Sequence, residues 1–162
     1  MGPITRLAYT DPFGLDPCLV LGNCSQAQEG NIGAHNSAKI AELRRDAQGM
    51  AKNAMAIAGA RGRTLFIAET RRTELRQNEL YQQGRNGNPG DIVTNCQGAH
   101  CPHVEARALD VYPVRNGTAL ITEARPSDME IVGTVGEAAG FEWGGGANWR
   151  KKDRPHWEVP NP

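Results

Sequence analysis

Two short stretches of the chain carry side chains that could hold a metal ion. The first is His103-Val-Glu-Ala-Arg-Ala-Leu-Asp110, and the second is Asp153-Arg-Pro-His156. Zinc in hydrolases is typically held by three His, Asp or Glu ligands with a fourth position open for water, and a nearby carboxylate can act as general base. We therefore predict that His103, Asp110 and His156 bind zinc. Asp153 is the predicted catalytic residue, which would take a proton from the metal-bound water.

Each of these residues, taken singly, also has an ordinary structural explanation. A lone histidine is more often a surface or hydrogen-bonded residue than a ligand, which is how we interpret His35 and His100. Asp110 could be a turn residue at the end of a strand, and Asp153 could pair with Arg150 or Lys151. Only the combined set indicates a metal site.

The overall composition argues against several classes of protein. The 162 residues suffice for one domain that buries about two-thirds of its unfolded surface. The 18 basic residues balance 18 acidic ones, so no global field favours nucleic acid or an anionic membrane as a partner. No apolar run reaches the roughly 18 residues of a spanning helix, and no ordinary secretory signal is present. We therefore expect neither nucleic-acid binding nor membrane binding.

The four cysteines fall into two close pairs, Cys18/Cys24 and Cys96/Cys101. Each pair could close a small disulfide loop, which would indicate an oxidising place of action. All four could equally be free thiols. Neither pair has the spacing of a cysteine-only zinc site.

Periodicity and turn signals predict the elements that must position the metal stretches. An apolar stripe at spacings of three and four predicts a helix from a cap at Asn36 or Ser37 to about residue 58. Further expected elements are a strand at 64–70, a helix at 74–83 capped by Thr73, and a strand at 108–114 paired with 119–121 across Asn116-Gly117. The last ones are a helix reaching Gly140, with Ser127 and Glu130 at capping-box spacing, and a strand at 156–159. This order predicts an α+β domain, a small antiparallel sheet with packed helices and with zinc in a cleft on the sheet.

The first metal stretch resembles the signature Ser-x-His-x-x-Gly-x-Ala-x-Asp of a zinc peptidase family that acts on bacterial cell walls. Here the frame reads Cys101-Pro-His103-Val-Glu-Ala106-Arg-Ala108-Leu-Asp110, so Cys101 replaces the serine and Ala106 the glycine. The family includes D-alanyl-D-alanine carboxypeptidases, VanY-like vancomycin-resistance enzymes, and phage endolysins that cut between L-alanine and D-glutamate. Ala106 removes backbone freedom where the loop turns, and Cys101 is near enough in sequence to contact zinc itself.

Two further signatures of the endolysin-like branch also occur. Trp-Gly-Gly, a nearby tryptophan and Asp-x-Pro-His correspond to Trp143-Gly144-Gly145, Trp149 and Asp153-Arg-Pro155-His156. An arginine five residues before a glutamine, then Leu-Tyr and Gln-Gly-Arg, corresponds to Arg72, Gln77, Leu80-Tyr81 and Gln83-Gly84-Arg85. The resemblance covers about residues 38–159, so it is specific although each motif alone is weak.

This resemblance implies Zn²⁺ as cofactor and peptidoglycan as substrate. It implies that Arg72 stabilises the oxyanion or grips a substrate carboxylate, and that Gln77 helps to bind substrate. Trp143, Trp149 and Trp157 are interpreted as packing around the site rather than as platforms for sugars. Whether an L-alanyl–D-glutamate bond or a D-alanyl bond is cut stays open.

Residues 1–35 contain several prolines and glycines and little periodicity, so we interpret them as a linker before a zinc peptidase domain at 36–162. Within them, Asp11-Pro12-Phe13-Gly14-Leu15 resembles the junction at which Rhs-repeat polymorphic toxins release their C-terminal toxin domain. This resemblance implies an antibacterial effector, delivered by a secretion apparatus such as type VI to the periplasm of competitors. Its partners would be the Rhs shell of the parent polypeptide and a cognate immunity protein. An ordinary Asp-Pro turn is the alternative for this stretch.

Other functions are compatible with the sequence. A phage endolysin or a housekeeping wall-remodelling carboxypeptidase would share the chemistry but not the delivery. A non-catalytic wall-binding module would keep a structural zinc whose shell is closed to water. The oligomeric state is not indicated.

Overall fold

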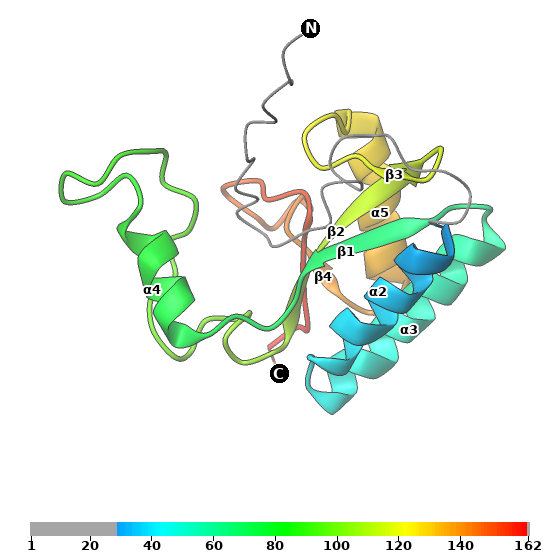
Figure 1. The fold of residues 1–162 in the computed structure, drawn as a ribbon, viewed down its shortest axis with the longest axis horizontal. Helices are drawn as coiled ribbons and strands as arrows, with labels where there is room; N and C mark the ends of the chain where they lie inside the picture. The colour runs from blue at the N-terminus through cyan, green and yellow to red at the C-terminus, as the bar shows by residue number, and fades with distance from the viewer. Residues whose placement is uncertain (1–28, 162) are drawn as a thin grey trace, which may run out of the picture.

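The computed structural model describes residues 29–161 as an α+β fold (Figure 1). Its sheet has the order β1-β2-β5-β4, and β3 pairs separately with β2. The strands are β1 (Leu65–Glu69), β2 (Ala108–Arg115), β3 (Thr118–Ala119), β4 (Glu142–Trp143) and β5 (His156–Glu158). All pairings are antiparallel, so the predicted fold class is confirmed. The toxin-like junction at 11–15 and the Cys18/Cys24 pair lie outside the described residues.

The predicted strands at 64–70, 108–114 and 156–159 and the hairpin are confirmed, but the strand predicted at 119–121 is wrong in its bounds, because β3 ends at Ala119. Asn116 and Gly117 have φ values of 51° and 75°, as a two-residue type I′ turn between β2 and β3 requires. β4 was not predicted, because two residues beside a glycine-rich loop are too few to show an alternating pattern.

The single helix predicted to end near residue 58 is wrong, because the chain forms two helices here. They are α2 (Glu29–Ala41) and α3 (Arg45–Ala60). The apolar stripe reads as one helix because buried side chains continue through the turn between them, at Leu43. Residues 29–35, which we assigned to the linker, form the first half of α2, and Ile32 within them is 1% exposed.

Asn36 does not cap a helix but lies inside α2 and faces β1. Its side-chain amide donates to the backbone oxygen of Leu65 at 2.8 Å, and its amide oxygen accepts from the backbone N–H of Ile67 at 2.9 Å. β1 is an edge strand, whose outer backbone groups need partners when they are buried. Asn36 supplies those partners and thereby fixes α2 against the sheet.

The remaining helices, α4 (Glu74–Gln82) and α5 (Pro126–Ala138), lie on different sides of the molecule. Figure 1 shows α5 near α2 and α3 on one side of the sheet, and α4 with the loop after it projecting on the other. Two glycines of α5 allow the tryptophan rings of β4 and β5 to pack directly on the helix. A Cβ atom at Gly133 would overlap the ring of Trp143, and one at Gly136 would overlap the ring of Trp157. Helices α2, α3 and α5 thus lie on one side of the sheet and leave the other side to α4 and the metal stretches.

The predicted start of α4 is confirmed, since the Thr73 side chain accepts the backbone N–H of Arg76 at 3.2 Å. The predicted cap Ser127 is wrong, because α5 begins one residue earlier, at Pro126. Proline suits the first helical position, where a backbone N–H would lack an intrahelical partner. Among the described helices, none combines the length and the apolar character needed to cross a membrane.

Candidate metal centre and active site

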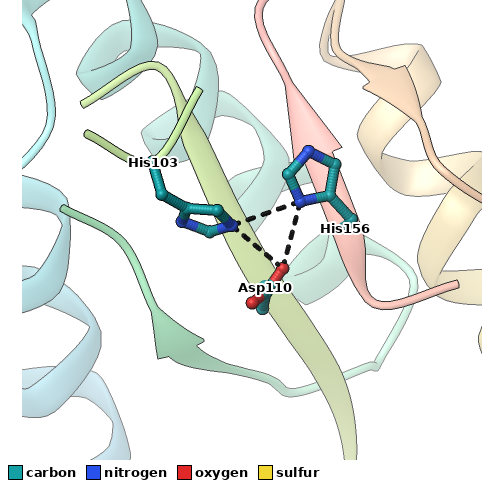
Figure 2. Close-up of side chains that lie close together, drawn as sticks. All are labelled: His103, Asp110 and His156. Atoms are coloured by element: carbon teal, nitrogen blue, oxygen red, sulfur yellow. Dashed lines mark hydrogen bonds and ion pairs between the residues drawn. The ribbon is translucent and has the colours of Figure 1, made fainter. Parts of the chain in front are cut away.

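The side chains of His103, Asp110 and His156 meet at one point of the fold (Figure 2). Asp110 lies in β2, His156 is its register partner in β5, and His103 comes from the turn before β2. His103 Nε2 lies 3.2 Å from His156 Nδ1, and Asp110 Oδ1 lies 3.4 Å and 3.3 Å from these two nitrogens. Tetrahedral zinc with ligands at about 2.0–2.1 Å places neighbouring ligand atoms about 3.3 Å apart. The three donor atoms therefore fit one face of such a tetrahedron.

The outer nitrogen of each imidazole is held by an acceptor that the sequence analysis missed. His103 Nδ1 donates to the buried backbone oxygen of Thr70 at 2.6 Å. His156 Nε2 donates to a carboxylate oxygen of Glu158 at 3.1 Å. Because both acceptors can only accept, each ring in its neutral form carries its proton on the outer nitrogen and leaves the lone pair of the inner nitrogen for a metal ion. The one available signal was the spacing of His156 and Glu158, which share a face of a strand.

The electrostatics of the group follow from burial and mutual contact. Burial opposes the charge on Asp110, but His103 and His156 outweigh it and hold the pKa of this carboxyl well below its usual range. Burial also opposes the charge on His156, yet its hydrogen bonds to Asp110 and Glu158 raise its pKa to about 9. In the metal-stripped protein His156 therefore keeps a proton that a metal ion must displace.

We expect the metal-stripped protein to lose stability as the pH rises from 6.5 toward 9. The folded-state pKa of His156, about 9, exceeds its ordinary value of 6.5. Protonation of His156 therefore stabilises the folded state, by roughly 3 kcal/mol below pH 6.5. This stabilisation is lost as the pH rises through the folded-state pKa. Urea denaturation in a chelator at both ends of the range measures it. His156→Gln should flatten the dependence, whereas the exposed control His100→Gln should not; an unchanged slope in His156→Gln would contradict the assignment.

Asp153 lies in the wall of the same cavity, which has a volume of about 870 Å³ and also contains the three metal-site residues. Burial, followed by the charge of Asp110, raises the pKa of Asp153, against the opposing effect of His156. A raised pKa suits a carboxylate that must take up and release a proton near neutral pH. An ion pair of Asp153 with Arg150 or Lys151 is not seen within residues 29–161.

Arg72 is not merely an exposed surface charge. Its side chain is 9% exposed, forms an ion pair with Glu69, and donates from Nη1 to Gln77 Oε1 at 2.6 Å. Gln77 in turn donates from Nε2 to the backbone oxygen of Cys96 at 2.6 Å. Both residues line the cavity, and their roles toward substrate stay predictions.

Cys96 and Cys101 form a disulfide, with an S–S distance of 2.12 Å. This resolves the choice between bridge and free thiols for the second cysteine pair. A sulfur in a disulfide is not a thiolate ligand, so the alternative in which Cys101 contacts the metal is wrong. The bridge joins the loop after α4 to the turn that carries His103.

Ala106, which replaces the glycine of the signature, has a φ of 56°. A left-handed conformation costs a residue with a Cβ atom about 1–2 kcal/mol. We therefore expect Ala106→Gly to raise the free energy of unfolding by up to about 1 kcal/mol, after the greater freedom of glycine in the unfolded chain is subtracted. Ala56→Gly, at an exposed position inside α3, is the matched control and should lower it by about 1 kcal/mol. If urea denaturation showed the same loss in the free energy of unfolding for both variants, residue 106 would be unstrained.

The aromatic residues divide into two groups. Trp143 and Trp157 are buried, as the packing interpretation predicted. Trp149 is only half-buried, lines the cavity, and has its ring centre 5.3 Å from that of His156. Tyr112, which the sequence analysis missed, also lines the cavity, two residues after Asp110 on the same strand. Burial, with the charges of Asp110 and other nearby carboxylates, raises the pKa of its phenol, so Tyr112 stays protonated.

Comparison with known proteins extends the resemblance seen in the sequence. The profile of a family described as D-alanyl-D-alanine carboxypeptidase matches residues 95–159, which include all four predicted metal-site and catalytic residues of the two stretches. The peptidoglycan L-alanyl-D-glutamate endopeptidase CwlK of Bacillus subtilis is 34% identical over 115 residues, which are 65% of this chain and 67% of that protein.

The fold has a counterpart of known structure. The crystal structure of the L-Ala D-Glu endopeptidase ChiX of Serratia marcescens superposes with a TM-score of 0.61. The match covers 78% of this chain and 87% of that chain at 19% sequence identity, so it supports the fold alone. With 34% identity across two-thirds of CwlK and a matching family profile, the chain belongs to the D-alanyl-D-alanine carboxypeptidase family of metallopeptidases.

Proposed function

We propose that this protein is a zinc-dependent peptidase that cleaves amide bonds in the stem peptides or cross-links of peptidoglycan. The observation that carries the proposal is the meeting of His103, Asp110 and His156 in the wall of a cavity that Asp153 also lines. CwlK and ChiX are both L-alanyl-D-glutamate endopeptidases by name. The L-alanyl–D-glutamate bond is therefore the first to test, and bonds of D-alanine are the second.

The metal ion and the nearby side chains would have separate roles in the reaction. Bound zinc would polarise the scissile carbonyl and lower the pKa of water from 15.7 toward about 7. Asp153 accepts a proton as water adds to the carbonyl carbon, and it donates that proton to the amine nitrogen as the carbon–nitrogen bond breaks. Arg72 is the candidate cation for the oxyanion or for a substrate carboxylate, and Gln77 holds one nitrogen of its guanidinium in place.

Digestion of purified cell wall tests the activity and identifies the bond. We expect the zinc-loaded protein to release peptide fragments, and a chelator to stop the release. Mass spectrometry of the fragments then distinguishes a new D-glutamate amino terminus from a shortened D-alanine end. Release that persists at full rate in the chelator, or no release at all, would refute the proposal.

Gly144→Ala is expected to lower kcat by about 100-fold. A Cβ atom at this position would overlap the backbone oxygen of Asp153 and lie 3.2 Å from the Cβ atom of His156, so the segment that carries the general base and the metal ligand must move. Misplacement by about 1 Å can cost this much. Gly59→Ala, where the added Cβ meets open space, is the matched control. A Gly144→Ala enzyme as active as the Gly59→Ala enzyme would show that Asp153 does not depend on this contact.

The biological role that we assign is that of an antibacterial effector acting in the periplasm of competitors. Two features support it: the toxin-like junction at 11–15, and the Cys96–Cys101 disulfide, since disulfides persist in oxidising compartments such as the periplasm. Delivery would occur as part of an Rhs polypeptide through a secretion apparatus, and a cognate immunity protein would block the cavity in the producer. Expression with a periplasm-directing signal should lyse the host, whereas expression without it should not. Lysis from the cytoplasm, or none from either place, would contradict this role.

The similarity to CwlK favours one alternative, a wall-remodelling or endolysin-type peptidase with no delivery function. The coding sequence upstream distinguishes the two roles. A long tyrosine-aspartate repeat region that runs into Asp11 supports the effector. A gene without such a region supports the alternative, while the chemistry remains the same.

A further inference from the structure

Glu158 connects the ligand His156 to a buried arginine from the other metal stretch. One of its carboxylate oxygens accepts from His156 Nε2 at 3.1 Å, and the other accepts from Arg107 Nη1 at 3.3 Å. The side chains of Glu158 and Arg107 are only 12% and 9% exposed. Arg107 also donates to the backbone oxygen of Val159 at 3.0 Å.

We infer that Glu158 and Arg107 are positioning residues, which orient His156 for the metal and hold its strand against the segment that carries His103 and Asp110. The inference rests on the metal centre of the proposed function. Hydrogen-bonded carboxylates behind histidine ligands fix the ring orientation and raise the basicity of the ligand nitrogen.

Only a carboxylate can do this at position 158. The two donors, His156 Nε2–H and the Arg107 guanidinium, approach different oxygens of the same group. A glutamine of the same shape has one acceptor and one NH₂ group, so one of the two donors would face another donor. The loss of that contact releases either the imidazole or the arginine.

Arg107 links two segments that lie far apart in the sequence. It lies between His103 and Asp110 in the chain, and its backbone oxygen accepts the N–H of Val159 at 2.9 Å. Its side chain therefore adds a second link to a strand pair already joined by backbone hydrogen bonds. The backbone sets the register, and the side chain sets the direction of Glu158.

Zinc affinity measured without substrate, by competition with a chromogenic chelator, tests the inference in the full chain. Glu158→Gln should weaken zinc binding by about 10–100-fold and shift the visible absorption bands of the Co²⁺-loaded protein. Glu105→Gln is the matched control, because Glu105 accepts from Arg107 Nε at 2.9 Å, whereas the carboxylates that contact His156 among the described residues are Asp110 and Glu158. It should change the affinity by less than about threefold, below the range expected of a group behind a ligand.

Each outcome decides the question. Equal affinities and equal Co²⁺ spectra for Glu158→Gln and Glu105→Gln would overturn the inference. If circular dichroism showed that Glu158→Gln does not fold, Arg107→Lys would be tested instead, since it keeps the positive charge but loses the planar guanidinium group. Weakened zinc binding by Arg107→Lys would support the inference, and unchanged binding would overturn it. Wild-type protein that binds no zinc would refute both the metal centre and this inference, whereas zinc binding without wall cleavage would refute the proposed function alone.

Discussion

Asp153→Asn is expected to lower kcat for cleavage of wall peptides by about 10²–10⁴-fold, the usual contribution of a general acid–base residue. The amide is nearly the same size but cannot take a proton from water or return one to the departing amine. Asp153 lines the cavity beside the metal site and its pKa is raised by burial and then by Asp110, both of which suit this task. Steady-state cleavage of a defined muropeptide measures the loss.

The variant must keep its metal for this result to be informative. Asp153 is not one of the three residues that converge on the metal position, so zinc content should stay at one ion per chain. Asp91→Asn, a change of the same kind on an exposed loop residue, is the control and should leave kcat unchanged. Full activity in Asp153→Asn would remove the general base from the mechanism and leave the proton transfer without a carrier.

Asp110→Ala is expected to weaken zinc binding by more than about 100-fold, and activity should be lost with the metal. Changes behind a ligand typically cost 10–100-fold, and here the ligand itself is removed. Asp110 is also the only residue of the converging group that is negative when His103 and His156 are neutral, so its loss removes the main electrostatic attraction for a divalent ion. Chelator competition gives the affinity, and elemental analysis gives the bound metal.

A matched change distinguishes loss of the ligand from loss of the fold. Asp91→Ala removes an exposed carboxylate from a loop and should leave zinc binding intact. Circular dichroism should show that Asp110→Ala retains its helices in the absence of metal. Stoichiometric zinc in folded Asp110→Ala would mean that the ion sits elsewhere, and the assignment of the metal centre would then be wrong.

The amino-acid sequence determined the residue types and their local setting. The spacing within residues 103–110 and 153–156 indicated metal chemistry, and alternation with turn residues located β1, β2, β5 and the hairpin, because these patterns are local. The prediction failed where an apolar stripe ran through a turn, between α2 and α3, since a buried side chain gives the same signal in a helix and in a tight connection. It also failed for Asn36, whose partners lie about thirty residues away on β1.

Only the tertiary structure decided which side chains meet. His103 and His156 are separated by 53 positions, and their approach depends on the register of β5 against β2, which places His156 opposite Asp110. Trp157 fixes this register, because its buried side chain packs against Gly136 of α5 on the face of the sheet opposite to the metal site. A one-residue slip would exchange the two faces, so burial of an indole ring, a long-range packing event, determines the position of the second imidazole.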